Sequence, residues 1–209
     1  MLGVKTRSEL TKASHDKEVF EIKQTLDWIA TADTPLKDRL DLTKVAIAAH
    51  SKGGKLAFFA AAIDDRVDVV IAWDPNNNGG PPCSLPLGEC NLFPVAPNCE
   101  ANDPGLQHLM RAESLVLGMP RDALNPDRHH NSIHFYRGAP SPASLVYYDA
   151  GHLGSIFNPD VIKLNKKVQL ALLLTRFKGV PGLEEFLPCT QEGQANLLKN
   201  SVVTRVEHK

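Results

Sequence analysis

The chain lacks an excess of charge of either sign. Lysine and arginine together number 23 and aspartate and glutamate 24, so the formal net charge of the 209 residues is -1 at pH 7. Nucleic acids and anionic membranes attract proteins through clustered positive charge, which this balance does not supply. We therefore expect neither nucleic acid nor an anionic membrane surface as a partner.

Long hydrophobic runs are missing as well. The N-terminal stretch MLGVKTRSELTKASHDKEVFE contains no apolar core of the kind that a signal peptide has. No later segment reaches the roughly 20 consecutive apolar residues that a transmembrane helix needs. The sequence therefore predicts a soluble protein with no signal peptide and no transmembrane segment, and it favours neither the plastid nor the cytoplasm.

Cysteine is scarce and is not spaced for metal binding. Three of the four cysteines, Cys83, Cys90 and Cys99, fall in one stretch rich in proline, glycine and asparagine, and Cys189 lies near the C-terminal end. Structural zinc sites pair cysteines about two to four residues apart, and no histidine stands among these three. We therefore predict no metal and no cofactor, and the cysteines are compatible with disulfides or with free thiols.

What the chain does contain is an alternation of helical and strand-like segments. Apolar residues at helical spacing predict helices at 17–32, 55–64 and 161–177, and short apolar runs predict buried strands at 45–49, 67–75, 112–119 and 143–151. This alternation predicts one α/β domain over residues 1–209, with a mostly parallel sheet flanked by helices. The connection at about 76–105 is unusually long, which is typical of a functional loop or lid.

A sharp turn between a strand and a helix holds Ser51, in the segment KVAIAAHSKGGKLAFFAAA. A nucleophile elbow places its serine at such a turn and requires small residues two positions before and after it. Ala49 and Gly53 stand at these positions, although the first of them is usually glycine. The pattern predicts Ser51 as a nucleophile, with the backbone N–H of Lys52 as an oxyanion donor at the start of the helix.

Two other interpretations of this turn explain less of it. A phosphate-binding P-loop needs a glycine where this chain has Ala49 and a hydroxyl residue where it has Leu56. A serine that only caps the helix is compatible with Ser51, but it does not require small residues on both sides. The elbow is therefore the favoured interpretation.

A nucleophilic serine works with an orienting carboxylate and a histidine base, which follow it along the chain in that order. His152 comes directly after the fourth predicted strand, so it can reach a serine at the same edge of the sheet. The alternative is that His152 has only a structural role. Asp74 and Asp122 both follow strands between Ser51 and His152. Their alternative roles are a turn residue before proline and a helix cap or loop carboxylate.

The remaining histidines fit the role of base less well. His15 and His50 precede the serine, His108 lies near the long connection, and His208 lies in a polar tail. The polar segment DRHHNSIH, residues 127–134, contains three more. We interpret this segment as a solvated loop, with a metal site as the less favoured alternative.

Taken in order, five segments of the chain resemble chlorophyllases and their α/β-hydrolase relatives: EIKQTLDWI, KVAIAAHSKGGKLAFFAAA, VVIAWDP, SLVLGM and HFYRGAPSPASLVYYDAGHLGSI. The resemblance extends over roughly residues 18–157. In that family the elbow commonly reads Gly-His-Ser-Arg-Gly-Gly-Lys, which is similar to residues 49–55 here, with Ala49 and Lys52 as the departures. The family's acid stands before a proline, as Asp74 does, and its base stands between glycine and leucine, as His152 does.

The resemblance implies an α/β-hydrolase fold and a catalytic triad of Ser51, Asp74 and His152 that cleaves a carboxylic ester without a cofactor. It implies Asp74 rather than Asp122 as the acid. It also implies a small hydrophobic ester as the substrate and, within that class, the phytyl ester of chlorophyll, hence chlorophyll degradation. A general carboxylesterase is the alternative activity. The long connection is expected to supply apolar contacts to the substrate through Leu92, Phe93 and Val95.

Family members begin with several strands ahead of the first helix predicted here, including the loop that donates a second oxyanion N–H. The N-terminal residues of this chain contain no strand-like run. The resemblance therefore implies an N-terminally truncated domain, an impaired oxyanion hole and an exposed sheet edge that favours self-association. The alternative function is a catalytically weak or inactive hydrolase-like binding or scaffold protein.

Overall fold

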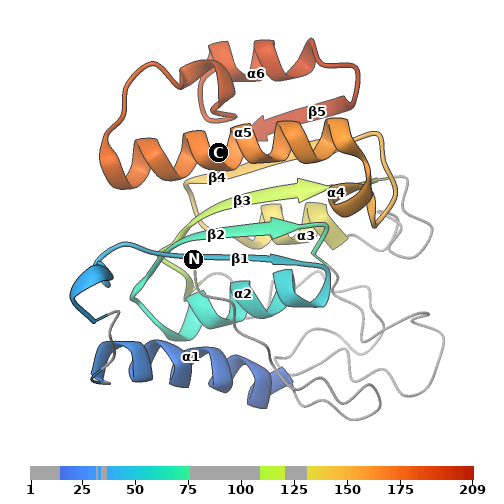
Figure 1. The fold of residues 1–209 in the computed structure, drawn as a ribbon. Coiled ribbons are helices and arrows are strands. Elements are labelled where there is room, and N and C mark those ends of the chain that lie inside the picture. The colour runs from blue at the N-terminus through green and yellow to red at the C-terminus, as the bar shows by residue number, and fades with distance from the viewer. Residues whose placement is uncertain (1–14, 32, 34–36, 76–108, 121–130) are drawn as a thin grey trace, which may run out of the picture.

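The computed structural model describes residues 15–31, 33, 37–75, 109–120 and 131–209, and these form an α/β structure around one mixed sheet (Figure 1). The strands lie in the order of the sequence: β1 (Val45–His50), β2 (Val67–Trp73), β3 (Glu113–Gly118), β4 (Ala143–Tyr148) and β5 (Val203–His208). β1 to β4 are parallel, and β5 runs antiparallel to β4. The α/β class and the mostly parallel sheet flanked by helices are confirmed.

The parallel strands and β5 differ in burial, which explains why only the former were predicted. β2, β3 and β4 are buried on both faces, so their sequences are almost continuously apolar. In β5, with the sequence VTRVEH, only Val203 is buried. The prediction of a polar tail around His208 is therefore wrong: His208 ends this strand, and its Nδ1 lies 3.0 Å from the hydroxyl oxygen of Ser144 on β4.

The described residues contain the helices α1 (His15–Thr31), α2 (Lys52–Ile63), α3 (Asn131–Gly138), α4 (Gly154–Phe157), α5 (Pro159–Lys178) and α6 (Gln191–Leu198), with short 3-10 turns η1 (Lys37–Arg39) and η4 (Glu184–Phe186). The predicted helices correspond to α1, α2 and α5. The prediction of a solvated loop at 127–134 is wrong for residues 131–134, which form the start of α3. An eight-residue helix is too short for a clear apolar period, so the sequence did not reveal it.

Helices cover both faces of the sheet. On one face, the rings of Phe58 in α2 and Phe135 in α3 are buried with their centroids 5.0 Å apart. On the other face, Val161 and Val168 of α5 pack into a core that includes Leu115 of β3. Figure 1 shows α5 and α6 at the top of the view and α1 and α2 at the bottom. The arrowheads of β1, β2 and β3 point to the right in that view, and β4 is parallel to β3, so the carboxyl ends of all four strands lie on the same side of the sheet.

α5 starts and stops where its flanking residues require. The side chain of Asn158 accepts hydrogen bonds from the backbone N–H groups of Asp160 and Val161, and Pro159 occupies the first helical position. Gly179 follows the last turn with a φ of 62°, a left-handed conformation that glycine adopts without strain. α4 lies directly before this capped start, so the beginning of α5 anchors the segment that follows β4.

β1 forms one edge of the sheet in the part of the chain that the structure describes. One side of β1 pairs with β2, and no described strand pairs with its other side. Ala46 and Ala48 of β1 are exposed. An unpaired edge is a template for association with another chain, so self-association stays a prediction. None of the helices in the described ranges is long and apolar enough to cross a bilayer.

Several predicted features lie outside the described residues. They are the long connection at about 76–105 with its cysteines and apolar contacts, the alternative acid Asp122, and three histidines: Cys83, Cys90, Cys99, Leu92, Phe93, Val95, His108, His129 and His130. The fourth cysteine, Cys189, is described and is a half-buried free thiol.

Candidate active site

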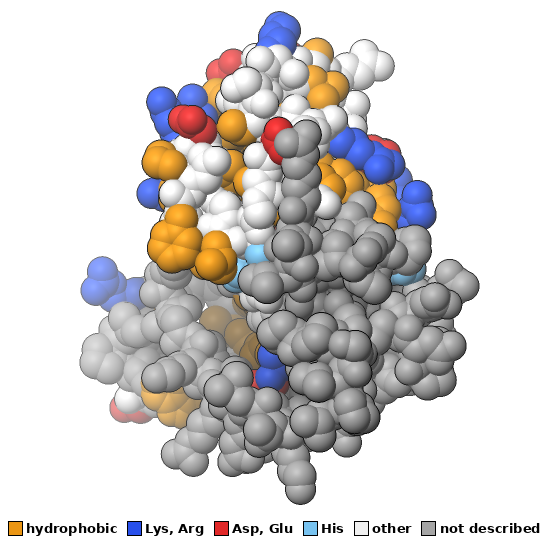
Figure 2. Space-filling view, turned by 90° about the vertical axis from the view of Figure 1, so that its right-hand side faces the viewer, with side chains coloured by type: hydrophobic (Ala, Val, Ile, Leu, Met, Phe, Trp, Pro, Cys, Tyr) orange, Lys and Arg blue, Asp and Glu red, His pale blue; other side chains and the backbone are white. Residues whose placement is uncertain are grey.

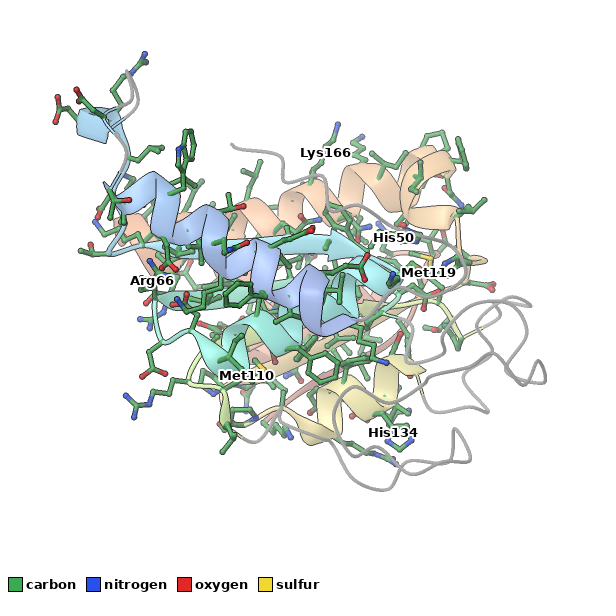
Figure 3. The ribbon with its side chains drawn as sticks, turned by 90° about the horizontal axis from the view of Figure 1, so that it is seen from below. His50, Arg66, Met110, Met119, His134 and Lys166 are labelled. Carbon is green, nitrogen blue, oxygen red and sulfur yellow. The ribbon has the colours of Figure 1, made fainter. Side chains whose placement is uncertain are left out.

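The three predicted triad residues lie at the edge of the sheet where the parallel strands end. Ser51 follows β1, Asp74 follows β2, and His152 follows β4 after a short loop. Ligand sites of open parallel sheets form at this edge, because side chains from several strand ends converge there. Figure 3 labels two residues at this end of the sheet, His50, which precedes Ser51, and Met119, which follows β3.

The three side chains form a continuous hydrogen-bonded relay. The Oγ of Ser51 lies 2.8 Å from Nε2 of His152, and Nδ1 of His152 lies 2.7 Å from Oδ2 of Asp74. Because a carboxylate only accepts hydrogen bonds, Nδ1 donates to Asp74, which leaves Nε2 of the neutral ring to accept from the serine hydroxyl. The imidazole is thus held in the tautomer that can take a proton from Ser51.

Ser51 has a strained backbone. Its φ of 55° and ψ of -125° lie in a region that residues other than glycine rarely occupy. Its N–H donates to the carbonyl oxygen of Trp73 at 2.9 Å, which ties the turn to the end of β2. Although Ser51 stands at the N-cap position of α2, its side chain makes no capping hydrogen bond. Helix capping therefore does not explain the serine, whose hydroxyl is bonded to His152 instead.

The close approach of α2 to the strands explains the small residues around Ser51. A Cβ built on Gly53 would lie 3.2 Å from the Cβ of Ala49, which leaves little room for larger residues at both positions. A Cβ built on Gly54 would lie 3.1 Å from the Cβ of Pro75 and 3.3 Å from that of Ala72. Alanine is accommodated at position 49 because Gly53, packed against it, carries no side chain.

Asp74 is buried, and both of its carboxylate oxygens accept hydrogen bonds. Its side chain is 2% exposed. Oδ2 accepts from His152, whereas Oδ1 accepts from the backbone N–H of Met119 at 3.2 Å and from the hydroxyl of Ser132 at 3.1 Å. Burial of a carboxylate is costly unless it is hydrogen-bonded, and these donors meet that requirement. The backbone N–H of Asp74 donates to Leu117 at 2.7 Å, which fixes its turn against β3.

Met119 and Ser132 belong to the site, although neither was predicted as a site residue. Ser132 comes from α3, which reaches Asp74 because of Gly118 at the end of β3. A Cβ built on Gly118 would lie only 2.3 Å from the ring of Tyr147 and 2.7 Å from the Cβ of Ser132. The sole hint in the sequence is a hydroxyl residue some way after the third strand, and no spacing rule relates such a residue to Asp74.

Lys52, the predicted oxyanion donor, is the first residue of α2. The first N–H groups of a helix have no intrahelical acceptor and carry the partial positive charge of the helix N-terminus. The Lys52 side chain makes a separate contact, since its Nζ lies 2.6 Å from the Oε2 of Glu18, whose side chain is 3% exposed. This ion pair joins the start of α2 to α1 and leaves the backbone N–H beside Ser51.

Other reactive side chains in the described residues have different surroundings. Burial raises the pKa of the Cys189 thiol, and the nearby Glu113 carboxylate raises it further, so the nucleophilic thiolate is disfavoured. Across the described ranges, no group of three or more histidine, cysteine, aspartate or glutamate side chains is arranged to hold a metal ion. Of the two candidate acids, Asp74 lies in the described ranges and contacts His152, and Asp122 lies outside them.

An open pocket with a volume of about 600 Å³ adjoins His152. It is lined by residues 150–154 and 157–159, which form the loop after β4, part of α4 and the start of α5. Leu153, Ile156 and Phe157 in this region are 44%, 47% and 73% exposed. Figure 2, which looks onto the edge where the parallel strands end, shows hydrophobic side chains beside histidine atoms. The described surface next to the imidazole is therefore largely apolar.

Comparisons with known proteins do not assign the chain to a family. No protein-family model matches it, and no curated protein matches it. The function is therefore argued from the geometry of Ser51, Asp74 and His152.

Proposed function

We propose that the protein is a serine ester hydrolase in which Ser51, His152 and Asp74 cleave a carboxylic ester. One observation carries this proposal: the relay from the Ser51 hydroxyl through the imidazole to a buried carboxylate, with links of 2.8 and 2.7 Å. The linked residues are 101 and 78 positions apart in the sequence. Nucleophile, base and orienting acid in this arrangement are what acyl transfer through a serine requires.

The first half of the reaction transfers the acyl group to the serine. Ser51 Oγ attacks the ester carbonyl carbon while its proton passes to Nε2 of His152, and the carbonyl oxygen becomes an oxyanion. The N–H of Lys52 stabilises that charge. The bond from the carbonyl carbon to the alcohol oxygen then breaks, and His152 returns its proton to the leaving alcohol. Asp74 stabilises the imidazolium in between.

The second half of the reaction releases the acid. Water attacks the acyl carbon while His152 accepts its proton, and the bond between the acyl carbon and Ser51 Oγ breaks as the proton returns to the serine. The products are a carboxylic acid, an alcohol and the unchanged protein. Every proton in this cycle is carried by side chains of the chain itself, so the proposal calls for no cofactor.

The apolar surface beside His152 favours an ester with a hydrophobic acyl or alcohol group. Leu153 and Phe157 line the pocket beside the base and expose apolar area, and burial of such area against a substrate is worth about 25 cal/mol per Å². The phytyl ester of chlorophyll, suggested by the resemblance of the sequence, belongs to this class, as do the substrates of a general carboxylesterase. Chromatography of chlorophyll after incubation with the protein separates these two activities, because only the first releases chlorophyllide.

A fluorophosphonate probe tests the nucleophile directly. We expect wild-type protein to be labelled at Ser51 and to hydrolyse a short p-nitrophenyl ester, and we expect Ser51→Ala to lose both properties. Ser201→Ala is a matched control, because Ser201 is an exposed serine between α6 and β5, and it should keep both. Wild-type protein that is folded by circular dichroism but takes up no probe and cleaves no ester refutes the proposal. That result would favour the alternative, a hydrolase-like binding or scaffold protein.

A further inference from the structure

His50 makes a contact that the triad mechanism leaves unused. Its Nε2 lies 2.9 Å from the backbone carbonyl oxygen of His152. A carbonyl oxygen only accepts hydrogen bonds, so Nε2 of His50 is the donor and carries a hydrogen. The two imidazole rings also lie in contact, with centroids 4.6 Å apart and planes inclined by 42°. The residue next to the nucleophile therefore touches both the main chain and the ring of the base.

The topology of the sheet shows why such a contact matters. His50 ends β1, whereas the loop of His152 follows β4, and β2 and β3 lie between these strands. Neighbouring strands are about 4.8 Å apart, so β1 and β4 are separated by roughly 14 Å. The loop must cross the ends of two strands before Nε2 of His152 comes within reach of Ser51 Oγ. A hydrogen bond from the end of β1 to the carbonyl of His152 holds the loop at the far side of that crossing.

Part of the loop around His152 is exposed, although Gly154 lies against Met119, since a Cβ built on Gly154 would be 3.3 Å from the Met119 sulfur. Gly151 is exposed, and a Cβ built on it would meet no atom within 4 Å. Leu153 is 44% exposed. The N–H of Gly154 bonds to the carbonyl of Gly151 at 2.6 Å, which shapes the loop locally but does not attach it to β1. A bond between the main chain of His152 and β1 therefore restricts a segment with little buried surface of its own.

We propose that His50 is a positioning residue, a role that rests on the ester hydrolase activity proposed above. By donating a hydrogen bond from Nε2 to the carbonyl oxygen of His152, it keeps the His152 imidazole within hydrogen-bond distance of Ser51 Oγ. His50 touches no reacting atom in this role. Misplacing a reacting group by about 1 Å can cost on the order of 100-fold in rate, so one main-chain bond is enough to matter.

The role requires a hydrogen-bond donor and not a charge. During the reaction the His152 ring becomes an imidazolium, and a second cation with its centroid 4.6 Å away would oppose that change. A neutral donor of similar length should therefore replace His50, whereas a side chain of similar size without a donor should not. This difference separates hydrogen bonding from simple filling of space.

Three variants of His50 make that comparison. His50→Gln keeps a neutral donor, and His50→Met has nearly the same length and shape without one. His50→Phe keeps an aromatic ring against His152 but removes the donor. We expect kcat for a short p-nitrophenyl ester to fall by roughly 10- to 100-fold in His50→Met and His50→Phe and by less than about 5-fold in His50→Gln. KM should change by less than about 3-fold in all three, because the substrate is not held by His50.

Proton NMR gives a readout that does not depend on turnover. The hydrogen-bonded Nδ1–H of His152 should give a far-downfield signal in the wild type and in His50→Gln, and we expect that signal to broaden or disappear in His50→Met and His50→Phe. Circular dichroism and the melting temperature establish that each variant is folded. If one variant without a donor fails to fold, the other still provides the comparison with His50→Gln.

Three results would overturn the role of His50. They are equal kcat values in wild type and the folded variants without a donor, equal losses in His50→Gln and His50→Met, or a loss that appears only in KM. Each of these presupposes an active wild type. An inactive, unlabelled wild type would instead refute the ester hydrolase activity itself, so the two failures are distinguishable.

Discussion

Replacement of Asp74 by asparagine tests the relay at the residue for which the structure gives the hydrogen-bond partners of both side-chain oxygens. Oδ1 of Asp74 accepts two hydrogen bonds, from the Met119 N–H and the Ser132 hydroxyl, while Oδ2 accepts one from His152 Nδ1. Asparagine has nearly the same shape but only one oxygen. The Met119 N–H can only donate, so the amide oxygen should stay on its side. The amide NH2 group then faces Nδ1 of His152.

That arrangement reverses the tautomer of the base. Facing an N–H donor, Nδ1 of His152 becomes an acceptor, and the hydrogen moves to Nε2. An Nε2 that carries a hydrogen cannot take the proton of Ser51, which lies 2.8 Å away. In serine proteases the same substitution lowers kcat by about 10⁴-fold. We expect a fall of about 10³- to 10⁴-fold here, equivalent to roughly 4–5.5 kcal/mol of activation free energy.

The assay compares kcat of wild type, Asp74→Asn and Asp122→Asn on one short p-nitrophenyl ester. Asp122→Asn is the informative control, since Asp122 is the other acid that the sequence allows. We expect it to stay within about 3-fold of wild type, because His152 Nδ1 is bonded to Asp74. The reasoning is refuted if Asp74→Asn stays folded and retains kcat within about 10-fold of wild type, or if Asp122→Asn suffers the larger loss.

Two further substitutions test the surroundings of the relay. Ser132→Ala removes one of the donors to Oδ1 of Asp74, and we expect about a 10-fold fall in kcat with little change in KM, measured by steady-state kinetics; unchanged kcat would contradict a supporting role. Phe157→Ser removes the most exposed apolar side chain of α4, and we expect kcat/KM for an octanoyl ester to fall by about 5- to 10-fold relative to an acetyl ester. Leu170→Ser, on the exposed side of α5, is the control that should leave this ratio unchanged, and an equal shift in both variants would argue against a substrate contact at Phe157.

The parts of the site that could be predicted are those with a local signature. Ser51, Asp74 and His152 each stand at the end of an apolar run, and runs of this kind are what strands buried on both faces must have. In a parallel sheet the carboxyl ends of the strands lie at one edge, so residues that directly follow the strands are predicted to lie close together. The α/β class followed from the same alternation.

The parts that could not be predicted depend on contacts between distant segments. β5 is half exposed, so its sequence does not differ from a polar tail, and only its pairing with β4 makes it a strand. Ser132 can donate a hydrogen bond to Asp74 because α3 packs closely over Gly118. The sequence of α3 alone does not indicate this close packing. His50 precedes the serine, and the chain order that excludes it as the base does not bear on a residue that supports the base.

The backbone conformations of Ser51 and Asp74 indicate that the positions of their side chains are maintained at a cost in stability. Ser51 and Asp74 have φ values of 55° and 41°, and each directly follows one member of the register pair His50 and Trp73. Backbone conformations with positive φ cost on the order of 1–3 kcal/mol for each residue other than glycine. Glycine at both places would relieve that strain but would remove the hydroxyl and the carboxylate. The N–H of Ser51 bonds to the carbonyl of Trp73 and that of Asp74 to the carbonyl of Leu117, so each strained turn is fastened to the next strand. The two strained residues both hydrogen-bond to the imidazole of His152, which follows β4. Strain is expected at these residues if the positions of their side chains serve catalysis.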